Sequence, residues 1–318
     1  MSRLRVGSMF AGIGGICQGF EQADFDMVWA NEIDTAACKT YKHNLGDEWL
    51  TTGDVRKISP TSIPDLDVLT AGFPCQSFSV AGKQKGFDDP RGNLFFEIAR
   101  IIDIKRPPVI FLENVANLLE HDEGRTFLVI YNSLVQFGYA IRYQVIDAHE
   151  YGNIPQPRSR IFIVAFLDYE ACDRFEFPEP VKLEVGINDI IQRDERKHDI
   201  YYYGDDSEVT QKHGQQIFDY DYIYRLSDRG LVRVRDNLCP TLTANMGTYP
   251  DRVPIIRDDH GIRKLTLREC LDFQGFPADF KFPKSITIDN AYKQIGNSVC
   301  IPVVKRIAEN ISVALQTV

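Results

Sequence analysis

The feature that most constrains the fold is a regular alternation of short apolar runs with longer amphipathic runs over the first half of the chain. The apolar runs are rich in β-branched residues and have strand length, whereas the amphipathic runs have the helical period. Because strands that alternate with helices build parallel sheets, the predicted class is α/β, Rossmann-like, with a mostly parallel sheet. Strands are predicted at 4–10, 26–33, 66–73, 108–115, 139–148 and 160–166, and helices at 15–23, 34–44, 93–105 and 126–138.

The pattern changes near residue 183. From there to residue 264 the apolar periodicity weakens, tyrosine, aspartate and glycine become frequent, and no alternation of strand and helix can be followed. Helical patterns return at 266–276 and 303–316. The sequence therefore predicts an α/β domain at 1–182, a smaller irregular domain at 183–264, and a C-terminal segment at 265–318 that returns to the first domain.

Seven cysteines are spread along the chain, and none belongs to a Cys-x-x-Cys pair. An odd number of scattered cysteines argues against a disulfide framework and against a zinc site, so no metal is expected. The sequence shows neither a secretory signal nor a membrane span, which needs about 18 consecutive apolar residues. These features predict a cytoplasmic location and no membrane partner.

The formal net charge of −9 gives the chain no overall attraction for nucleic acid. The charge is uneven, however, because basic residues gather in two glycine-bearing stretches at 82–93 and 225–236. A basic cleft on an acidic body therefore remains compatible with the composition.

A glycine-rich stretch, FAGIGG, follows the first predicted strand. Glycines at a strand-to-helix turn let the backbone approach a ligand, and an acid about 20 residues further on can hold ribose hydroxyls. Glu32 ends the second predicted strand and Asp54 follows in GDV, where it could accept from an adenine amino group. Alone, the loop is as compatible with a tight turn, but the two acids favour a nucleotide-type cofactor.

A second stretch, GFPCQSFS, places Cys75 just beyond the end of the strand predicted at 66–73. A single cysteine is most often a small buried apolar residue. Here its position favours a function, because open α/β sheets bind ligands at the carboxyl ends of their strands. Residues 76–93 have the glycine content of a mobile lid.

Two further stretches carry charged side chains to the same edge. Glu113 in FLENV ends another predicted strand, where it would either cap the next helix or serve a site. Arg158 and Arg160 in QPRSRIF are predicted to alternate on one face as a strand begins, with surface ion pairing as the alternative.

Five stretches, in this order and spacing, resemble the motifs of the bacterial DNA (cytosine-5) methyltransferases: FAGIGG, GFPCQSFS, ENV, QPRSRIF and QIGNSV. The resemblance covers nearly all of the chain except 183–264. It implies the Rossmann-like fold of the S-adenosylmethionine-dependent methyltransferases, with 183–264 as the target-recognition domain and 1–182 as the catalytic and cofactor-binding domain.

The resemblance implies a covalent mechanism. Because cytosine C5 is a poor nucleophile, the thiolate of Cys75 would add to C6 and make C5 reactive towards the methyl sulfonium of S-adenosylmethionine. Glu113 would hold a proton or hydrogen bond at N3, Arg160 would hold O2, and Arg158 would help to position the site. A stacked base offers no face to this attack, so the cytosine would be flipped out of the duplex.

The resemblance also implies contacts with the cofactor, whose product is S-adenosylhomocysteine, and with DNA. The implied cofactor residues are Phe10, Ala11, Gly12, Gly14, Gly15, Glu32, Ile33, Asp54, Val55, Gly72, Pro74, Leu94, Asn297 and Ser298. The implied DNA contacts are Ser79, Lys83 and Arg91 in the lid and Arg233, Arg235 and Thr241 in the recognition segment.

We therefore predict a site-specific DNA (cytosine-5) methyltransferase that acts on double-stranded DNA as a monomer. It would belong to a restriction–modification system, with a restriction endonuclease as its functional partner. Relatives of this fold methylate cytosine in transfer RNA; GFPCQSFS and the size of 183–264 favour DNA. A catalytically silent nucleotide- or DNA-binding module is the other alternative, which the presence of Cys75, Glu113, Arg158 and Arg160 disfavours.

Overall fold

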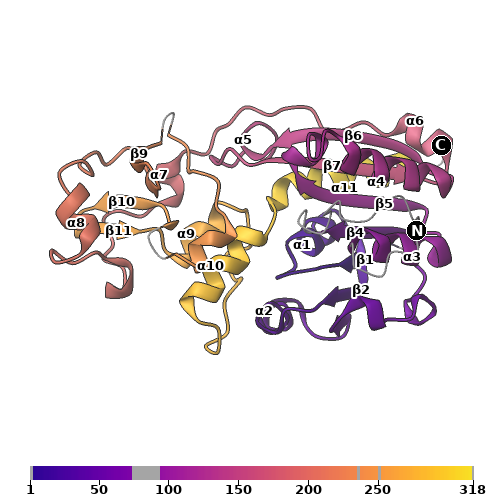
Figure 1. The fold of residues 1–318 in the computed structure, drawn as a ribbon, viewed down its shortest axis with the longest axis horizontal. Helices are drawn as coiled ribbons and strands as arrows, with labels where there is room; N and C mark the ends of the chain where they lie inside the picture. The colour runs from indigo at the N-terminus through magenta and orange to yellow at the C-terminus, as the bar shows by residue number, and fades with distance from the viewer. Residues whose placement is uncertain (1–2, 74–93, 235–236, 250–251, 317–318) are drawn as a thin grey trace. The chain divides into compact units, whose positions relative to one another are not determined.

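The computed structural model describes residues 3–73, 94–234, 237–249 and 252–316 (Figure 1). Backbone contacts divide the chain into two compact units. The first unit comprises Met1–Ile146, Ser159–Glu179 and Val303–Val318, and the second comprises Asp147–Arg158 and Pro180–Pro302. Because a division by contacts is not a division by function, the functional segments 1–182, 183–264 and 265–318 stay predictions.

A seven-stranded sheet forms the centre of the described part of the first unit, in the order β3-β2-β1-β4-β5-β7-β6. The strands from β3 to β5 pair in parallel, whereas β7 runs antiparallel to β5. This is the predicted α/β class with a mostly parallel sheet. The strands are β1 (Arg5–Met9), β2 (Asp26–Glu32), β3 (Leu50–Thr52), β4 (Val68–Gly72), β5 (Val109–Val115), β6 (Ala140–Asp147) and β7 (Ser159–Phe166).

Both faces of this sheet are covered by helices. On one face, buried residues of α3 (Leu94–Lys105) and α4 (Arg125–Gln136) share an apolar core with Ile110 of β5. Phe111 points to the opposite face, as the period of a strand requires. Its ring packs edge to face against the ring of Phe20 in α1 (Gly15–Glu21), with 5.2 Å between the ring centroids. The other helices of this unit are α2 (Thr35–Leu45), α6 (Tyr169–Arg174) and most of α11 (Ile301–Leu315).

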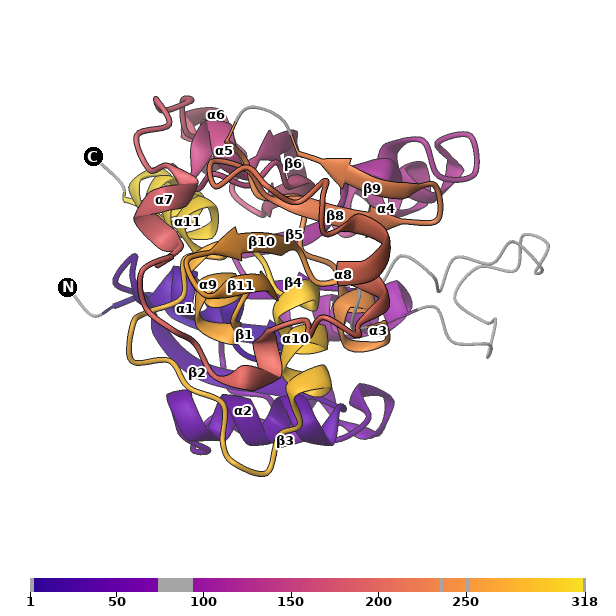
Figure 2. The same ribbon diagram turned by 90° about the vertical axis from the view of Figure 1, so that its left-hand side faces the viewer.

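The described part of the second unit contains a four-stranded antiparallel sheet in the order β11-β10-β8-β9 (Figure 2). The segment predicted as irregular therefore holds two ordered hairpins. Strands of four residues are too short to show a periodicity in the sequence. The strands are β8 (Tyr224–Ser227), β9 (Gly230–Arg233), β10 (Ile255–Asp258) and β11 (Gly261–Lys264), and the helices α5 (Ala148–Tyr151), α7 (Ile187–Ile190), α8 (Glu208–His213), α9 (Leu267–Asp272) and α10 (Ile288–Asn297).

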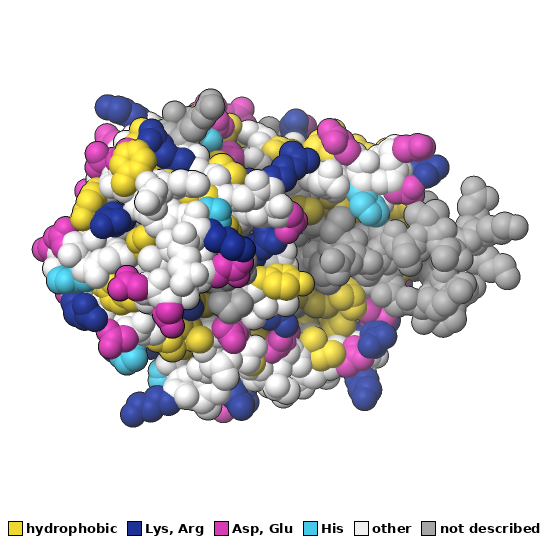
Figure 3. Space-filling view, turned by 60° about the vertical axis from the view of Figure 1, so that its left-hand side comes forward, with side chains coloured by type: hydrophobic (Ala, Val, Ile, Leu, Met, Phe, Trp, Pro, Cys, Tyr) yellow, Lys and Arg dark blue, Asp and Glu magenta, His cyan; other side chains and the backbone are white. Residues whose placement is uncertain are grey.

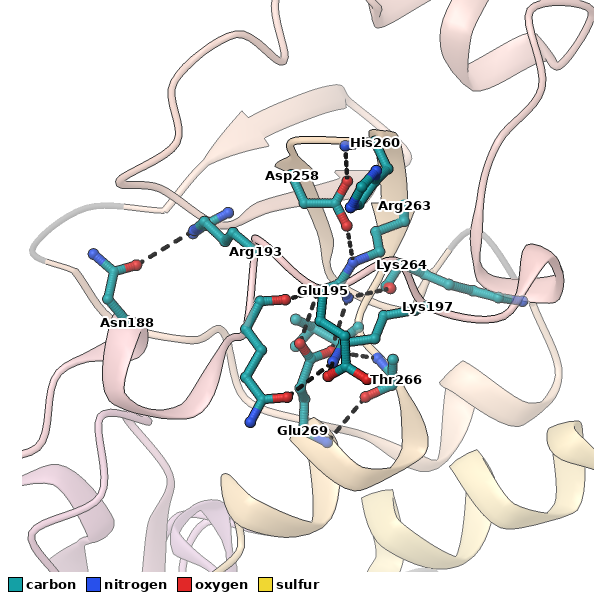
Figure 4. Close-up of polar contacts among 12 residues, drawn as sticks. Asn188, Arg193, Glu195, Lys197, Asp258, His260, Arg263, Lys264, Thr266 and Glu269 are labelled. Carbon is teal, nitrogen blue, oxygen red and sulfur yellow. Dashed lines mark hydrogen bonds and ion pairs between the residues drawn. The ribbon is translucent and has the colours of Figure 1, made fainter.

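A buried charge network joins the β10–β11 hairpin to α9 (Figure 4). The fully buried guanidinium of Arg263 donates to Asp258 at 2.6 Å and, through two nitrogens, to Glu269 at 2.8 Å each. Glu269 also accepts from the backbone N–H of Thr266, which completes the N-terminal capping box of α9. Each buried charge thus has hydrogen-bonded partners of opposite sign, as burial requires.

The structure confirms every strand and helix predicted in the first half and both helices predicted near the C-terminus. Strand β3 and helix α10 were missed, as were the short helices α5, α6, α7 and α8. In the part of the chain that is described, no helix is long and apolar enough to cross a membrane.

Candidate active site

Glu113 and Arg160 meet at the carboxyl end of β5. Because β7 is antiparallel to β5, its first residues lie beside the last residues of β5, and Arg160 pairs with Val115. The Nε atom of Arg160 lies 3.1 Å from Oε1 of Glu113, and the two side chains are only 16% and 11% exposed. Two of the four predicted catalytic side chains are therefore together, with the guanidinium of Arg160 beside the carboxyl group of Glu113.

The end of β4 is tied to the same place by Asn114. This buried side chain donates from Nδ2 to the backbone carbonyl of Phe73 at 2.8 Å, and its Oδ1 accepts from the N–H of Val115. Phe73 stands two residues before Cys75, which lies outside the described residues together with Pro74, Ser79, Lys83 and Arg91. Asn114 thus fixes the point from which the chain leaves β4.

The predicted cofactor residues of the first unit lie at the carboxyl ends of neighbouring parallel strands, the edge where open α/β sheets bind ligands. Phe10 to Gly15 connect β1 to α1, Glu32 ends β2 and Ile33 follows it, and Gly72 ends β4. Asp54 and Val55 follow β3, and Leu94 begins α3.

The loop after β1 is held open by Glu32. The buried carboxylate accepts from the N–H of Gly12 at 2.8 Å and from the N–H groups of Ile33 and Asp34. Gly12 has a φ of +56°, and nothing lies within 4 Å of the position that a Cβ would take. The loop therefore leaves space for a ligand against its backbone, while the two Glu32 oxygens keep acceptor capacity for hydroxyl groups.

Asp54 is held ionised in a defined orientation. Its side chain caps the 3-10 helix at Val55–Lys57 and forms an ion pair with Arg56 at 2.6 Å. The hydrogen bond from Arg56 lowers the pKa of Asp54 to about 2. A carboxylate that stays charged at neutral pH suits the predicted acceptor for an adenine amino group.

Arg158 does not lie on the strand face that carries Arg160. The prediction that the two alternate on one strand was wrong, because β7 begins at Ser159 and Arg158 belongs to the second unit. Its buried guanidinium donates to the backbone carbonyls of Leu242 at 2.6 Å, Gly296 at 3.1 Å and Ser298. In this structure Arg158 therefore holds backbone in place.

Gln156 binds the same segment. Its Oε1 accepts from the N–H of Leu242 at 2.9 Å, and its Nε2 donates to the carbonyl of Phe273 at 2.6 Å. The hydroxyl of Thr241, a predicted DNA contact, donates to the carbonyl of Pro157 at 2.5 Å. Residues 155–158 and 239–242 are thus joined along their length.

Asn297 and Ser298 lie where α10 ends, in the second unit. Asn297 is exposed, and Ser298 is buried. The hydroxyl of Ser298 is buried as well and has no hydrogen-bond partner among the described residues. A buried hydroxyl without a partner is costly, so a ligand that pairs with it would be favoured.

Arg233, another predicted DNA contact, is already engaged. Its guanidinium lies 3.6 Å from the centre of the Tyr222 ring and 3.4 Å from a carboxylate oxygen of Asp219. Arg235 lies outside the described residues.

The comparisons with known proteins agree on one family. A family model described as C-5 cytosine-specific DNA methylase matches residues 4–313. The chain belongs to this family. The methylase is 49% identical to the Type II methyltransferase M.Bsp6I of Bacillus sp. (strain RFL6), over 97% of this chain and 98% of that protein. It is 35% identical to the Type II methyltransferase M.HhaI of Haemophilus parahaemolyticus, over 99% and 96% of the two chains.

A solved structure, that of the Entamoeba histolytica methyltransferase EhMeth, superposes on the methylase with a TM-score of 0.75 at 22% identity and covers both chains completely. At this identity the likeness concerns the fold. The family and its named relatives establish that the methylase is a DNA cytosine-5 methyltransferase. The catalytically silent alternative is thereby excluded.

The family uses S-adenosylmethionine, and the residues of the methylase fit this cofactor. In the first unit, the open space beside Gly12 offers an approach to the backbone, and the ionised Asp54 offers an acceptor. Sequence reasoning missed Asn114 and Gln156, although both stand inside motifs that it had singled out. Their role shows only when the backbone groups that they bind are known.

Proposed function

We propose that the methylase flips a cytosine out of duplex DNA at a short specific sequence and methylates C5 through a covalent intermediate on Cys75. When bound, S-adenosylmethionine supplies an electrophilic methyl group. The proposal is supported above all by one observation, the contact between Glu113 and Arg160 at the end of β5.

The contact suits catalysis at a pyrimidine ring. Arg160 orients the Glu113 carboxyl group through Nε and donates from Nη1 to the carbonyl of Ser159 at 2.8 Å, which leaves Nη2 for a carbonyl oxygen such as O2 of cytosine. A carboxyl group placed at N3 can donate a proton there while charge develops on the ring. Asn114 holds the backbone carbonyl of Phe73, which stands two residues before Cys75 in the sequence.

Cys75 and Glu113 carry out the covalent steps. The thiolate of Cys75 forms a bond to C6, and the electron pair of the C5–C6 double bond becomes available at C5 while Glu113 protonates N3. Once C5 carries the methyl group, the C5 proton leaves to a base, the double bond reforms, and the bond from C6 to the Cys75 sulfur breaks. Glu113 recovers its proton from N3.

A trapping experiment tests the covalent step. Fluorine at C5 cannot leave as a proton does, so a duplex that contains 5-fluorocytosine at the target position is expected to leave a covalent adduct on Cys75, detected by mass spectrometry of the full chain. An enzyme that methylates DNA but forms no adduct would contradict addition at C6.

A substitution tests the role of the carboxyl group. Glu113→Gln is expected to lower kcat by roughly 10²- to 10⁴-fold, the usual contribution of a general acid, and to leave the dissociation constant of S-adenosylmethionine unchanged. Glu120→Gln, an exposed acid on the same part of the chain, is the matched control and should keep wild-type kcat. An equal loss in both variants would remove Glu113 from the mechanism.

The remaining proposals concern context. We infer that the methylase acts as a monomer in the cytoplasm and protects its host from a restriction endonuclease of the same specificity. Methyl label that appears in transfer RNA and not in duplex DNA would instead favour the transfer RNA alternative.

A further inference from the structure

Two arginines of the second unit differ from all its other described arginines. The other described guanidinium groups of this unit bind carboxylates, carbonyls or rings; Arg252, which precedes β10, binds Asp228, and Arg257 of β10 donates to the carbonyl of Ile217. The side chains of Arg225 and Arg229 are exposed and have no partner among the described residues. The contacts among the described residues therefore give the charges of these two arginines no role in stabilising the fold.

Both arginines stand on the β8–β9 hairpin. Ser227 pairs with Gly230, so Asp228 and Arg229 are the two residues of a tight turn. The hydroxyl of Ser227 accepts from the N–H of Arg229 at 3.3 Å and donates to the carbonyl of Gly230 at 2.9 Å. The ion pair between Asp228 and Arg252 anchors the turn from outside. The backbone that carries Arg229 is therefore fixed although its side chain is free.

Arg225 points away from the core of the unit. Leu226 and Leu231 pair across the hairpin and pack on a cluster that includes Ile217 and Ile255. Residues one position away along a strand face the other side, where Arg225 lies opposite the exposed Val232. The hairpin thus buries one face and presents an arginine on the other.

A two-stranded ribbon of this kind fits the major groove of DNA, and arginine bound to O6 and N7 of guanine is the commonest specific contact there. The two arginines are not simply part of a broad basic patch. The chain carries a net charge of −9, and on the face drawn in Figure 3 basic and acidic side chains are interspersed.

We propose that Arg225 and Arg229 are specificity-determining residues that read guanine bases in the major groove of the target duplex. The assignment rests on the proposed function and deepens it. It also explains why Arg233, which the sequence singled out, is held by Tyr222 and Asp219: Arg233 stiffens the hairpin that presents the other two.

Lysine variants separate base reading from phosphate binding, because lysine keeps the charge but lacks the planar fork that binds guanine through two hydrogen bonds. The full-length wild type and its Arg225→Lys and Arg229→Lys variants would each methylate a library of random-sequence duplexes. Sequencing for 5-methylcytosine then gives the motif and the rate on each sequence. Arg196→Lys, an exposed arginine paired with Asp199, is the matched control.

Each variant at position 225 or 229 is expected to methylate the wild-type motif about 5- to 150-fold more slowly and to accept another base pair where the wild type requires G·C. The control should keep motif and rate, and all three variants should keep the wild-type urea midpoint. An unchanged motif at both positions, an equal loss of rate on every sequence, or a lowered midpoint would overturn the assignment. Absence of 5-methylcytosine with the wild type would overturn the proposed function itself, which makes the two failures distinguishable.

Discussion

At the scale of single residues, the two arginines of QPRSRIF have different surroundings. Arg160 contacts a carboxylate that the mechanism uses, whereas Arg158 contacts the backbone carbonyls of Leu242, Gly296 and Ser298. In our proposal Arg160 is a catalytic residue and Arg158 is a positioning residue. In this proposal one arginine of the motif takes part in the reaction and the other holds the backbone in place.

Arg158→Lys tests this division. The three carbonyls are placed around two nitrogens of the guanidinium, an arrangement that the single nitrogen of lysine does not reproduce. A buried carbonyl left without its donor costs about 1–3 kcal/mol. The variant is therefore expected to lower the free energy of unfolding by about 3 kcal/mol, measured by urea denaturation with far-UV circular dichroism. Unchanged stability together with a large loss of kcat would contradict a positioning role and support a direct catalytic one.

At the scale of elements, helix α10 packs against the 3-10 helix at Ala244–Gly247 with backbone in close contact. A Cβ on Gly296 would lie 2.1 Å from the backbone carbon of Thr243, a distance that no real contact allows. The glycine is needed for this approach, and it brings the carbonyls of Gly296 and Ser298 to the guanidinium of Arg158.

Gly296→Ala is expected to destabilise the protein, although helix propensity alone predicts that alanine stabilises a helix. Alanine inside a helix is normally favoured over glycine by about 1 kcal/mol, but here we expect the urea midpoint to fall because the added methyl group forces α10 away from Thr243. Lys212→Ala, on the exposed side of α8, is the control and should change the midpoint little. A stabilised Gly296→Ala variant would show that the close contact is not part of the fold.

At the scale of the whole molecule, the thiols among the described residues are all buried. None of these six cysteines forms a disulfide. Burial raises the pKa of Cys17 and of Cys38 to about 11, and it raises the pKa of Cys172, Cys239 and Cys270 as well. A thiol with a raised pKa is almost wholly protonated at neutral pH and reacts slowly.

Iodoacetamide at pH 7.5 is therefore expected to label Cys75 first and to inactivate the enzyme with one label per chain. Peptide mapping locates the label, and prior incubation with a 5-fluorocytosine duplex and S-adenosylmethionine should protect the thiol. The Cys75→Ser variant should remain unlabelled over the time in which the wild type takes up one label. Rapid labelling of any of the six buried cysteines would contradict the assignment.

Much of the fold could be predicted because its causes are local. Asp34 caps α2 by accepting from the N–H groups of Ala36 and Ala37, a signal that needs only three neighbouring residues. The hairpins of the second unit could not be predicted, because their strands are four residues long and pack on residues of other elements, as β8 does on Ile217 and on Ile255 of β10.

By itself, the sequence determined the α/β class, the order of the elements in the first unit and the motifs that carry the chemistry, since periodicity, caps and turns act over a few residues. Only the tertiary structure decided which groups meet. The reversal of β7 brings Arg160 to Glu113, and residues more than 80 positions apart bind Arg158. Side-chain contacts between distant segments depend on packing, and packing also decided which of the described arginines of the second unit are bound within it.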